Sequence, residues 1–255
     1  MSSIASRNKP LAVRLFGADA DELRAAIVPH SSLHLLDANG DDSPDVVVCY
    51  GGDGTLLSAE LKWPGVPKVP IRNSRRGLRM MDHPPDEILQ RLAENRLVPT
   101  EFLKVRCRVR AGGNEYTLRA LNEINVQLAR TNSAVRFQMW IDDEPFEGGV
   151  EIIGDGFLVS TPFGSTAYYK QITRGIFYTG LGIALKFTSE LVNHFVVKED
   201  SVIRARITRG PASMANDNAA EEVHLVDGDE MVIAEDLQNA VVLAWEALRR
   251  PSEEL

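Results

Sequence analysis

The sequence predicts an α/β lobe in the N-terminal part of the chain and a β-rich lobe in the C-terminal part. Three observations support this fold class. Strand-like and helix-like segments alternate before Pro99, as they do in parallel α/β structures. After Pro99 the chain consists mainly of short β-rich runs divided by turn sequences. A length of 255 residues is enough for two lobes, each with a core of its own.

The first hundred residues provide the alternating elements. Residues 11–16 alternate apolar and polar side chains as a strand does, and residues 20–28 have the composition of a short helix with acidic residues in its first turn. Further strands are predicted at 32–36 and 45–50, and helices at 55–63 and 86–95, the last after two prolines. These elements define an α/β domain over residues 1–100.

The remaining chain is predicted to be mostly strand. The β-rich runs lie at residues 103–110, 116–125, 135–141, 156–160, 201–207 and 222–225. Residues 208–222 are polar and contain few large apolar side chains, which predicts a mobile loop. Residues 237–250 have a helix-like composition. We therefore expect a β-rich domain over 101–236 and a helical segment over 237–255 that packs back on the N-terminal domain.

Composition and charge restrict the functional classes. No apolar run approaches the roughly 20 residues that cross a bilayer, and the N-terminus lacks a secretory signal, so we expect a soluble cytoplasmic protein without a membrane partner. The net charge of −8 argues against nucleic-acid binding. Cys49 and Cys107 lie in apolar strand-like runs, which predicts buried free thiols.

The sequence GGDGT at residues 51–55 directly follows a buried strand. Glycines at the carboxyl end of a parallel strand let the backbone approach a ligand closely. Asp53 would then accept a proton from an attacking hydroxyl or hold a metal ion carried by a nucleotide. The alternative is that Asp53 caps the following helix. No lysine follows Gly54, so the segment is not the usual phosphate-binding loop.

Two further segments are rich in groups that can contact a nucleotide. Asn122 and Glu123 begin a β-like run, and residues 154–169, GDGFLVSTPFGSTAYY, contain one carboxylate and several hydroxyls among glycines. Taken separately, the first pair could be solvated turn residues, and the second segment could be a strand and a loop that satisfies its own backbone.

Together the three segments resemble the NAD kinase family. That family carries GGDGT, an Asn-Glu pair and a GDG…STPxGSTAY segment in this order, and the resemblance spans residues 45–228. GGDGT alone is weak evidence because lipid kinases and phosphofructokinases share versions of it, whereas the long third segment is specific. The resemblance implies a Rossmann-like α/β lobe and a β-sandwich-like C-terminal lobe, in a homodimer or homotetramer.

The resemblance also implies an activity and residue roles. The family transfers a phosphoryl group from ATP, or from polyphosphate, to the 2′-hydroxyl of the adenosine ribose of NAD, with Mg²⁺ accompanying ATP. Asp53 matches the general base on that hydroxyl, and no protein residue is expected to form a metal site of its own. The positions expected to bind substrate are Gly52, Gly54, Thr55, Asn122, Glu123, Asp155, Thr166, Ala167 and Tyr168.

The chain departs from the family pattern in several places, including the segment after Tyr168, where Arg174 stands beside Gly175, and two of the departures concern named side chains near the site. Where the family has a glycine-rich segment, this chain has Arg75, Arg76 and Arg79, which either contact donor phosphates or lie in a solvated loop. Phe163 stands where relatives carry a hydroxyl, and it could stack on the ligand or fill space. These departures concern the donor side more than the adenosine side.

Three functions remain in competition at this point. An NAD kinase is favoured by all three segments. A lipid kinase of the diacylglycerol type shares GGDGT, and the length of the third segment argues against it. A dinucleotide-binding protein without turnover would explain the altered segments, although binding alone does not require Asp53.

Overall fold

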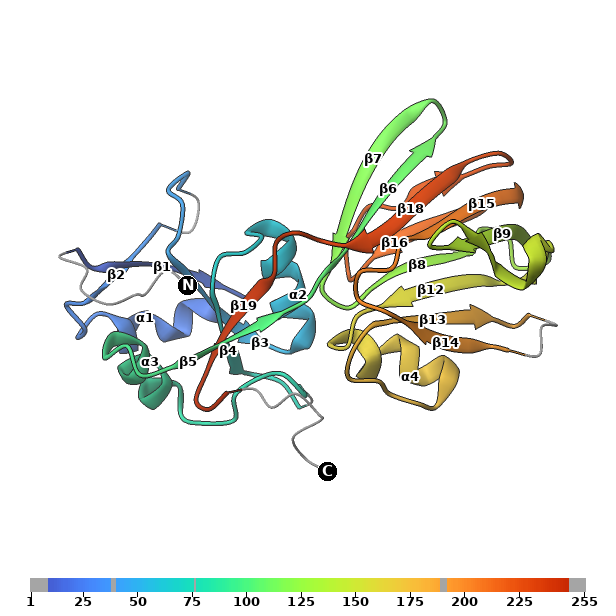
Figure 1. Ribbon diagram of the computed structural model, residues 1–255. Helices are drawn as coiled ribbons and strands as arrows, with labels where there is room; N and C mark the ends of the chain where they lie inside the picture. Colours follow the sequence, from blue (N-terminus) through green and yellow to red (C-terminus); the bar gives the residue numbers. More distant parts are fainter. Residues whose placement is uncertain (1–8, 38–39, 76, 189–191, 248–255) are drawn as a thin grey trace. The chain divides into compact units, whose positions relative to one another are not determined.

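A computed structural model describes residues 9–37, 40–75, 77–188 and 192–247 (Figure 1). The chain forms two compact units. The first contains residues up to Phe102 together with the segment from Ala240 onwards, and the second contains Leu103–Asn239. The predicted change from an α/β to a β-rich composition is confirmed, because three of the four α-helices belong to the first unit and most strands belong to the second.

The first unit contains one six-stranded sheet in the order β2-β1-β3-β4-β19-β5. The strands are β1 Leu11–Phe16, β2 Leu33–Leu35, β3 Val46–Gly51, β4 Lys68–Arg72, β5 Val98–Phe102 and β19 Ala240–Ala244. The first four are parallel to one another, and β19 is parallel to β4 and antiparallel to β5. Its helices are a 3-10 turn Ala20–Leu23, α1 Arg24–Ile27, α2 Asp53–Lys62 and α3 Pro85–Ala93.

The order of the strands follows from the sequence pattern of β3. Its apolar run is buried throughout, as expected for a strand covered on both faces, and β1 and β4 lie on either side of it. Side chains from the strands and helices form one core cluster, which includes Val13, Val48, Ile71 and Leu89. The chain passes from β1 to β2 in one direction and from β3 to β4 in the other, so the order reverses between β1 and β3.

The helix predicted over residues 237–255 is wrong where the structure describes this segment. Residues 240–244 form β19, which lies between β4 and β5. Val242 is fully buried and Ala240 and Leu243 are nearly so. The run AVVLA contains two β-branched residues, and its burial between two strands outweighs the helix-like composition that follows. Residues 248–255 lie outside the described residues.

The second unit contains two sheets. One has the order β10-β9-β15-β18-β6-β7, with β11 also paired to β9, and the other has the order β14-β13-β12-β8-β16-β17. The strands of the first sheet are β6 Val105–Ala111, β7 Asn114–Ala120, β9 Val135–Ile141, β10 Glu144–Pro145, β11 Ile152–Gly154, β15 Ile203–Arg209 and β18 Glu230–Glu235. Those of the second are β8 Glu123–Leu128, β12 Gly156–Ser160, β13 Leu181–Lys186, β14 His194–Val197, β16 Ala212–Asn216 and β17 Val223–Leu225.

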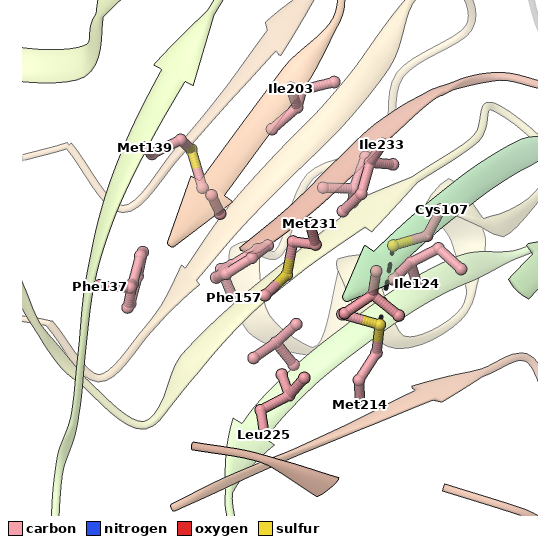
Figure 2. Close-up of a cluster of buried hydrophobic side chains, with 14 of the residues drawn as sticks. Cys107, Ile124, Phe137, Met139, Phe157, Ile203, Met214, Leu225, Met231 and Ile233 are labelled. Carbon is pink, nitrogen blue, oxygen red and sulfur yellow. Dashed lines mark hydrogen bonds between the residues drawn. The ribbon is translucent and has the colours of Figure 1, made fainter. Parts of the chain in front are cut away.

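One hydrophobic core joins the two sheets. Alternate residues of each strand enter it, including Phe137 and Met231 from the first sheet and Phe157 and Met214 from the second (Figure 2). Cys107 Sγ lies 3.7 Å from Met214 Sδ in this core. Both cysteines are buried free thiols, as predicted. Helix α4, Tyr168–Thr173, packs near the opposite face of the second sheet.

Several strands were not predicted, and three of them show why. The loop predicted at 208–222 contains β16, which pairs with β8 and β17, and its side chains Ala212 and Met214 are completely buried. Strand β4 includes Pro70 and follows a proline-rich segment, which suggested an interruption. Strand β5, Val98–Phe102, pairs with β19. Its side chains are mostly exposed, so its sequence lacks the apolar pattern that predicts a strand.

Candidate active site

The carboxyl ends of β1 and β3 form a glycine-lined edge in the first unit. Gly17 follows β1, and a Cβ atom there would lie 2.0 Å from the carbonyl oxygen of Tyr50. A Cβ atom on Gly51 would lie 2.3 Å from Thr55 Oγ1. Only glycine fits this close approach, which occurs at the point where strand order reverses. Open α/β sheets bind their ligands at such points.

Asp53 is the first residue of α2, and its side chain does not cap that helix. Instead, the two carboxylate oxygens accept backbone N–H groups of the segment after β4. Oδ1 accepts from Arg79 at 2.9 Å and Oδ2 from Leu78 at 3.0 Å. Each carboxylate oxygen has a second lone pair, so the carboxylate keeps acceptor capacity for a ligand.

The segment of residues 73–82 places one arginine near this carboxylate. Burial lowers the pKa of the Arg79 guanidinium, and the negative charge of Asp53 opposes that shift. Arg75 is exposed, and Arg76 lies outside the described residues. Among the described arginines, Arg79 interacts electrostatically with Asp53, whereas the donor-phosphate role of Arg75 and Arg76 stays a prediction.

In the second unit, Asp217 holds the Asn-Glu segment in place. Its carboxylate accepts three consecutive backbone N–H groups, from Leu121 at 2.8 Å, Asn122 at 2.8 Å and Glu123 at 3.2 Å. Asp217 directly follows β16, and sequence reasoning did not single it out. A lone aspartate in a polar segment gives no signal that it binds a backbone 95 residues away.

The third motif packs directly on the same segment. The backbone N–H of Thr161 donates to the Asn122 carbonyl at 2.9 Å, and Thr161 Oγ1 donates to the Leu121 carbonyl at 2.5 Å. A Cβ atom on Gly164 would lie 2.3 Å from the Asn122 carbonyl oxygen. The fold thus brings the second and third motifs together within one unit.

Glu123 is a buried carboxyl group next to a second carboxylate. Burial and, as the smaller cause, the charge of Asp217 raise its pKa to about 8. Within the described ranges, Glu123 Oε2 is buried without a hydrogen-bond partner. A buried polar atom of this kind costs free energy unless a ligand or a water molecule satisfies it.

Lys186 is a buried lysine that lies near two predicted site residues, Tyr168 and Asp155. Lys186 Nζ donates to Asn125 Oδ1 at 2.7 Å and lies 5.8 Å from the centre of the Tyr168 ring. Burial lowers the pKa of Lys186 to about 8, against the opposing effect of the Asp155 charge. The sequence did not point to Lys186, because no strand was predicted there and a single lysine carries no motif.

The other residues of the third motif form the turn into α4. Thr166 ends a 3-10 turn, and its hydroxyl donates to the Phe163 carbonyl at 3.5 Å. Ala167 connects this turn to Tyr168, which begins α4 and is 39% exposed. Phe163 is buried, consistent with a space-filling role rather than a stack on a ligand.

Two kinds of feature are absent from the described residues. In these ranges no three His, Cys, Asp or Glu side chains are grouped so that they could hold a metal ion. Within the same ranges, none of the helices combines the length and apolar composition that crossing a membrane requires.

Comparison with curated proteins supports one family. The chain is 33% identical over 149 residues to NAD kinase 1 of Oceanobacillus iheyensis, which covers 55% of this chain and 54% of that protein. It is also 33% identical over 178 residues to the NAD kinase of Levilactobacillus brevis, covering 67% of this chain and 61% of that protein. The chain is a homologue of the NAD kinases. The resemblance stated from the motifs is thereby confirmed.

The extent of the match to these NAD kinases is partial. The chain spans about half the length of the first curated relatives it matches: 54% of the Oceanobacillus protein and 53% of the Enterococcus faecalis NAD kinase. No family model matches the chain.

Solved structures extend the likeness over nearly the whole fold. A yeast NADH kinase complexed with NADH matches 93% of this chain with a TM-score of 0.79 and 16% sequence identity. An NAD kinase from Archaeoglobus fulgidus in complex with ATP matches 95% of the chain with a TM-score of 0.72 and 21% identity. At these identities the comparison establishes the fold shared with these kinases.

Proposed function

We propose that this NAD kinase homologue phosphorylates the 2′-hydroxyl of the adenosine ribose of NAD, with ATP as donor, to give NADP. The observation that carries the proposal is the clustering of the second and third motifs around Asn122 in the second unit, together with a carboxylate at the glycine-lined edge of the first. The relatives named NAD kinase and the ATP and NADH complexes of the structural neighbours support the choice of substrates.

Asp53 is proposed to take the proton from the ribose hydroxyl. A hydroxyl is a poor nucleophile at neutral pH, and a carboxylate within hydrogen-bond reach typically contributes about 10²–10⁴ in rate. The two N–H groups of Leu78 and Arg79 fix the orientation of this carboxylate and leave one lone pair on each oxygen. Gly52, Gly54 and Thr55 are proposed to bring backbone groups close to the phosphates.

The second unit is proposed to bind the dinucleotide. Asn122 and Glu123 would donate or accept hydrogen bonds to the adenosine half, and Glu123, with its raised pKa, can donate from a protonated carboxyl group near neutral pH. The unpartnered Glu123 Oε2 supports a ligand contact at this position. Asp155, Thr166, Ala167 and Tyr168 are proposed to line the same surface.

A divalent cation is compatible with this set of residues. Mg²⁺ is usually held by one or two carboxylates together with substrate phosphates, and the free lone pairs of Asp53 match that pattern. When bound with ATP, Mg²⁺ neutralises the charge of the transferred phosphoryl group. Arg79, close to Asp53, would add a cationic group on the same side.

Four finer expectations belong to this proposal. They are a Rossmann-like first domain over 1–100, a β-sandwich-like dinucleotide-binding domain over 101–236, a homodimer or homotetramer, and a cytoplasmic location. The strand order of the first unit and the shared core of the two sheets support the first two. The oligomeric state and the location stay predictions from the family resemblance.

The proposal is tested with purified protein, NAD, ATP and Mg²⁺, followed by an enzymatic assay for NADP. We expect wild type to form NADP and Asp53→Asn to lose at least about 10²-fold in kcat while it still binds NAD. Exposed Asp86→Asn on α3 is the matched control and should keep wild-type activity. Wild-type binding of NAD without NADP would replace the kinase by a dinucleotide-binding protein without turnover.

A further inference from the structure

Lys186 is a buried cation on the outer face of the second sheet of the second unit. It is the last residue of β13, and the alternation of this strand places Ile183 and Leu185 in the core between the sheets. Ala184 and Lys186 therefore face the opposite side, where α4 packs on Ala184. Lys186 is only 4% exposed.

The ammonium group has more donors than the described protein uses. It has three N–H donors and no acceptor, and it donates once, to Asn125 Oδ1. Among the residues that the structure describes, no carboxylate lies within ion-pair distance of it, and Asp155 acts on it only through its charge. A buried cation without a counter-ion is costly, so an anionic partner would stabilise this arrangement.

The row of the sheet that contains Lys186 carries few side chains. In the sheet, Gly156 pairs with Lys186 on one side and with Gln127 on the other, so no side chain stands between them in this row. Gly156 has a φ of +121°, and a Cβ atom there would lie 2.2 Å from the Val126 carbonyl oxygen. This position therefore strongly favours glycine, and it separates Lys186 from the amide of Gln127.

Other charged and titratable groups near this face are few. Helix α4 contributes Tyr168, whose ring lies 5.8 Å from the ammonium, and the exposed Lys170. The neighbouring strands contribute exposed His194 on β14 and buried Glu123 on β8. None of these supplies an ion pair to Lys186 within the described ranges.

We propose that Lys186, together with Asn125 and the ring of Tyr168, binds an anionic phosphate oxygen of the dinucleotide. The inference rests on the proposed function, because it takes the dinucleotide as the ligand of this unit. Lysine is a frequent phosphate ligand that acts as a point charge. The lowered pKa of Lys186 agrees with this role, since a bound phosphate would restore the counter-ion that burial removes.

The test compares a ligand with phosphate and one without. Binding of NAD and of adenosine is measured by calorimetry for wild type, for Lys186→Met, which keeps the length of the side chain, and for the exposed control Lys170→Met. We expect Lys186→Met to weaken NAD binding about tenfold or more, and to change adenosine binding less than about twofold. The control should match wild type for both ligands.

A second measurement uses wild type alone and does not depend on how the variant folds. Near pH 8, part of the Lys186 population is neutral, so binding of a phosphate should take up protons, and the observed heat should vary with the ionisation enthalpy of the buffer. NAD affinity should fall as pH rises from 7 to 9.5, because the cation is lost. Adenosine, which is proposed to contact Glu123 and not Lys186, should show only the contribution of Glu123, so both effects should be clearly larger with NAD than with adenosine.

The outcomes separate this inference from the proposed function. Equal losses of NAD and adenosine binding in Lys186→Met, no loss of NAD binding in that variant, or a proton uptake with NAD no larger than with adenosine would each overturn the role of Lys186 while the kinase proposal stands. Absence of NAD binding in wild type would contradict both. NAD binding that depends on Lys186, in a protein that forms no NADP, would support this inference and contradict the kinase.

Discussion

At the scale of single residues, Glu123 shows how the fold controls the charge of a side chain. Its carboxyl group lies in a buried position beside Asp217, which itself is held by three backbone N–H groups. Asp217 is therefore the carboxylate that accepts these hydrogen bonds, and Glu123 is the carboxyl group whose ionisation is unfavourable. Two neighbouring carboxyl groups in one site commonly divide their protonation states in this way.

A pH-dependent stability follows from the raised pKa of Glu123. The folded protein holds a proton on this group up to about pH 8, whereas the unfolded chain releases it near 4.5. The stabilisation from the neutral carboxyl group is fully present below about pH 4.5. It is lost as pH rises towards 8. Glu123→Gln should therefore be more stable than wild type at pH 8.5, by up to about 5 kcal/mol, since the pKa rises from 4.5 to about 8 and one pKa unit corresponds to about 1.4 kcal/mol.

Urea unfolding at pH 5.5 and 8.5 measures this difference. Exposed Glu115→Gln on β7 serves as the control, because its carboxylate pairs with Arg110 at the surface. The gain of Glu123→Gln should shrink at pH 5.5. An equal gain at both pH values would show that the effect comes from packing and not from ionisation.

At the scale of elements, the contact between Gly164 and Asn122 joins the third motif to the second. A side chain on Gly164 would meet the Asn122 carbonyl carbon and oxygen, which belong to a backbone that Asp217 and Thr161 fix on other sides. This backbone has little freedom to move. We therefore expect the element that begins at Gly164 to be displaced by any larger residue.

Gly164→Ala tests this contact. We expect a loss of about 1–3 kcal/mol in the free energy of unfolding, as for overpacked cores, and a weaker affinity for NAD. The matched control is Gly175→Ala, since a Cβ atom there meets only Thr173 Oγ1, at 3.7 Å, an ordinary contact. Denaturant unfolding and calorimetry with NAD measure both effects. A Gly164→Ala protein as stable as the Gly175→Ala protein would contradict the proposed rigidity.

The elements also show what the sequence can predict and what it cannot. Strands β1, β9 and β12 were predicted at their observed bounds, because their alternating or continuous apolar runs are local signals. Strands β16 and β19 were missed, since their burial comes from partners far along the chain. The site follows the same rule. Local motifs indicated Asp53, Asn122 and Glu123.

Residues that act through contacts with distant parts of the chain are not contained in the sequence motifs and were not predicted. Asp217 binds a segment 95 residues earlier, and Lys186 binds Asn125 from 61 residues away. Neither contact leaves a pattern in one sequence, because the side chains meet only after the strands have paired. The three-dimensional structure is therefore needed to recognise both residues.

At the scale of the whole molecule, the first unit is built from two distant parts of the chain. Strand β19 lies between β4 and β5 and buries Val242 completely. Directly after β19, the Trp245 ring stacks on His83 at 4.2 Å and lies 3.7 Å from the Arg91 guanidinium carbon. Without this segment β4 and β5 would have no common partner.

Truncation after Asn239 tests this dependence. We expect the first unit to become protease-sensitive while a resistant fragment of the second unit, Leu103–Asn239, remains. Val242→Asp keeps the length of the chain and should have a similar effect, because it buries a charge without a partner. Exposed Val226→Asp is the control. Limited proteolysis with mass spectrometry provides the measurement, and a first unit that stays resistant in both variants would contradict the role of β19.

The position of β19 also bears on how the protein is made. The 137 residues from 103 to 239 are translated after β5 and before β19. At about 5–20 residues per second, a ribosome needs roughly 7–27 s for them. During that time the nascent N-terminal sheet lacks β19, the strand between β4 and β5. The second unit, in contrast, already has all its strands at the end of that time and can fold. The second unit can therefore complete its fold before the first unit, although the first unit begins earlier in the sequence.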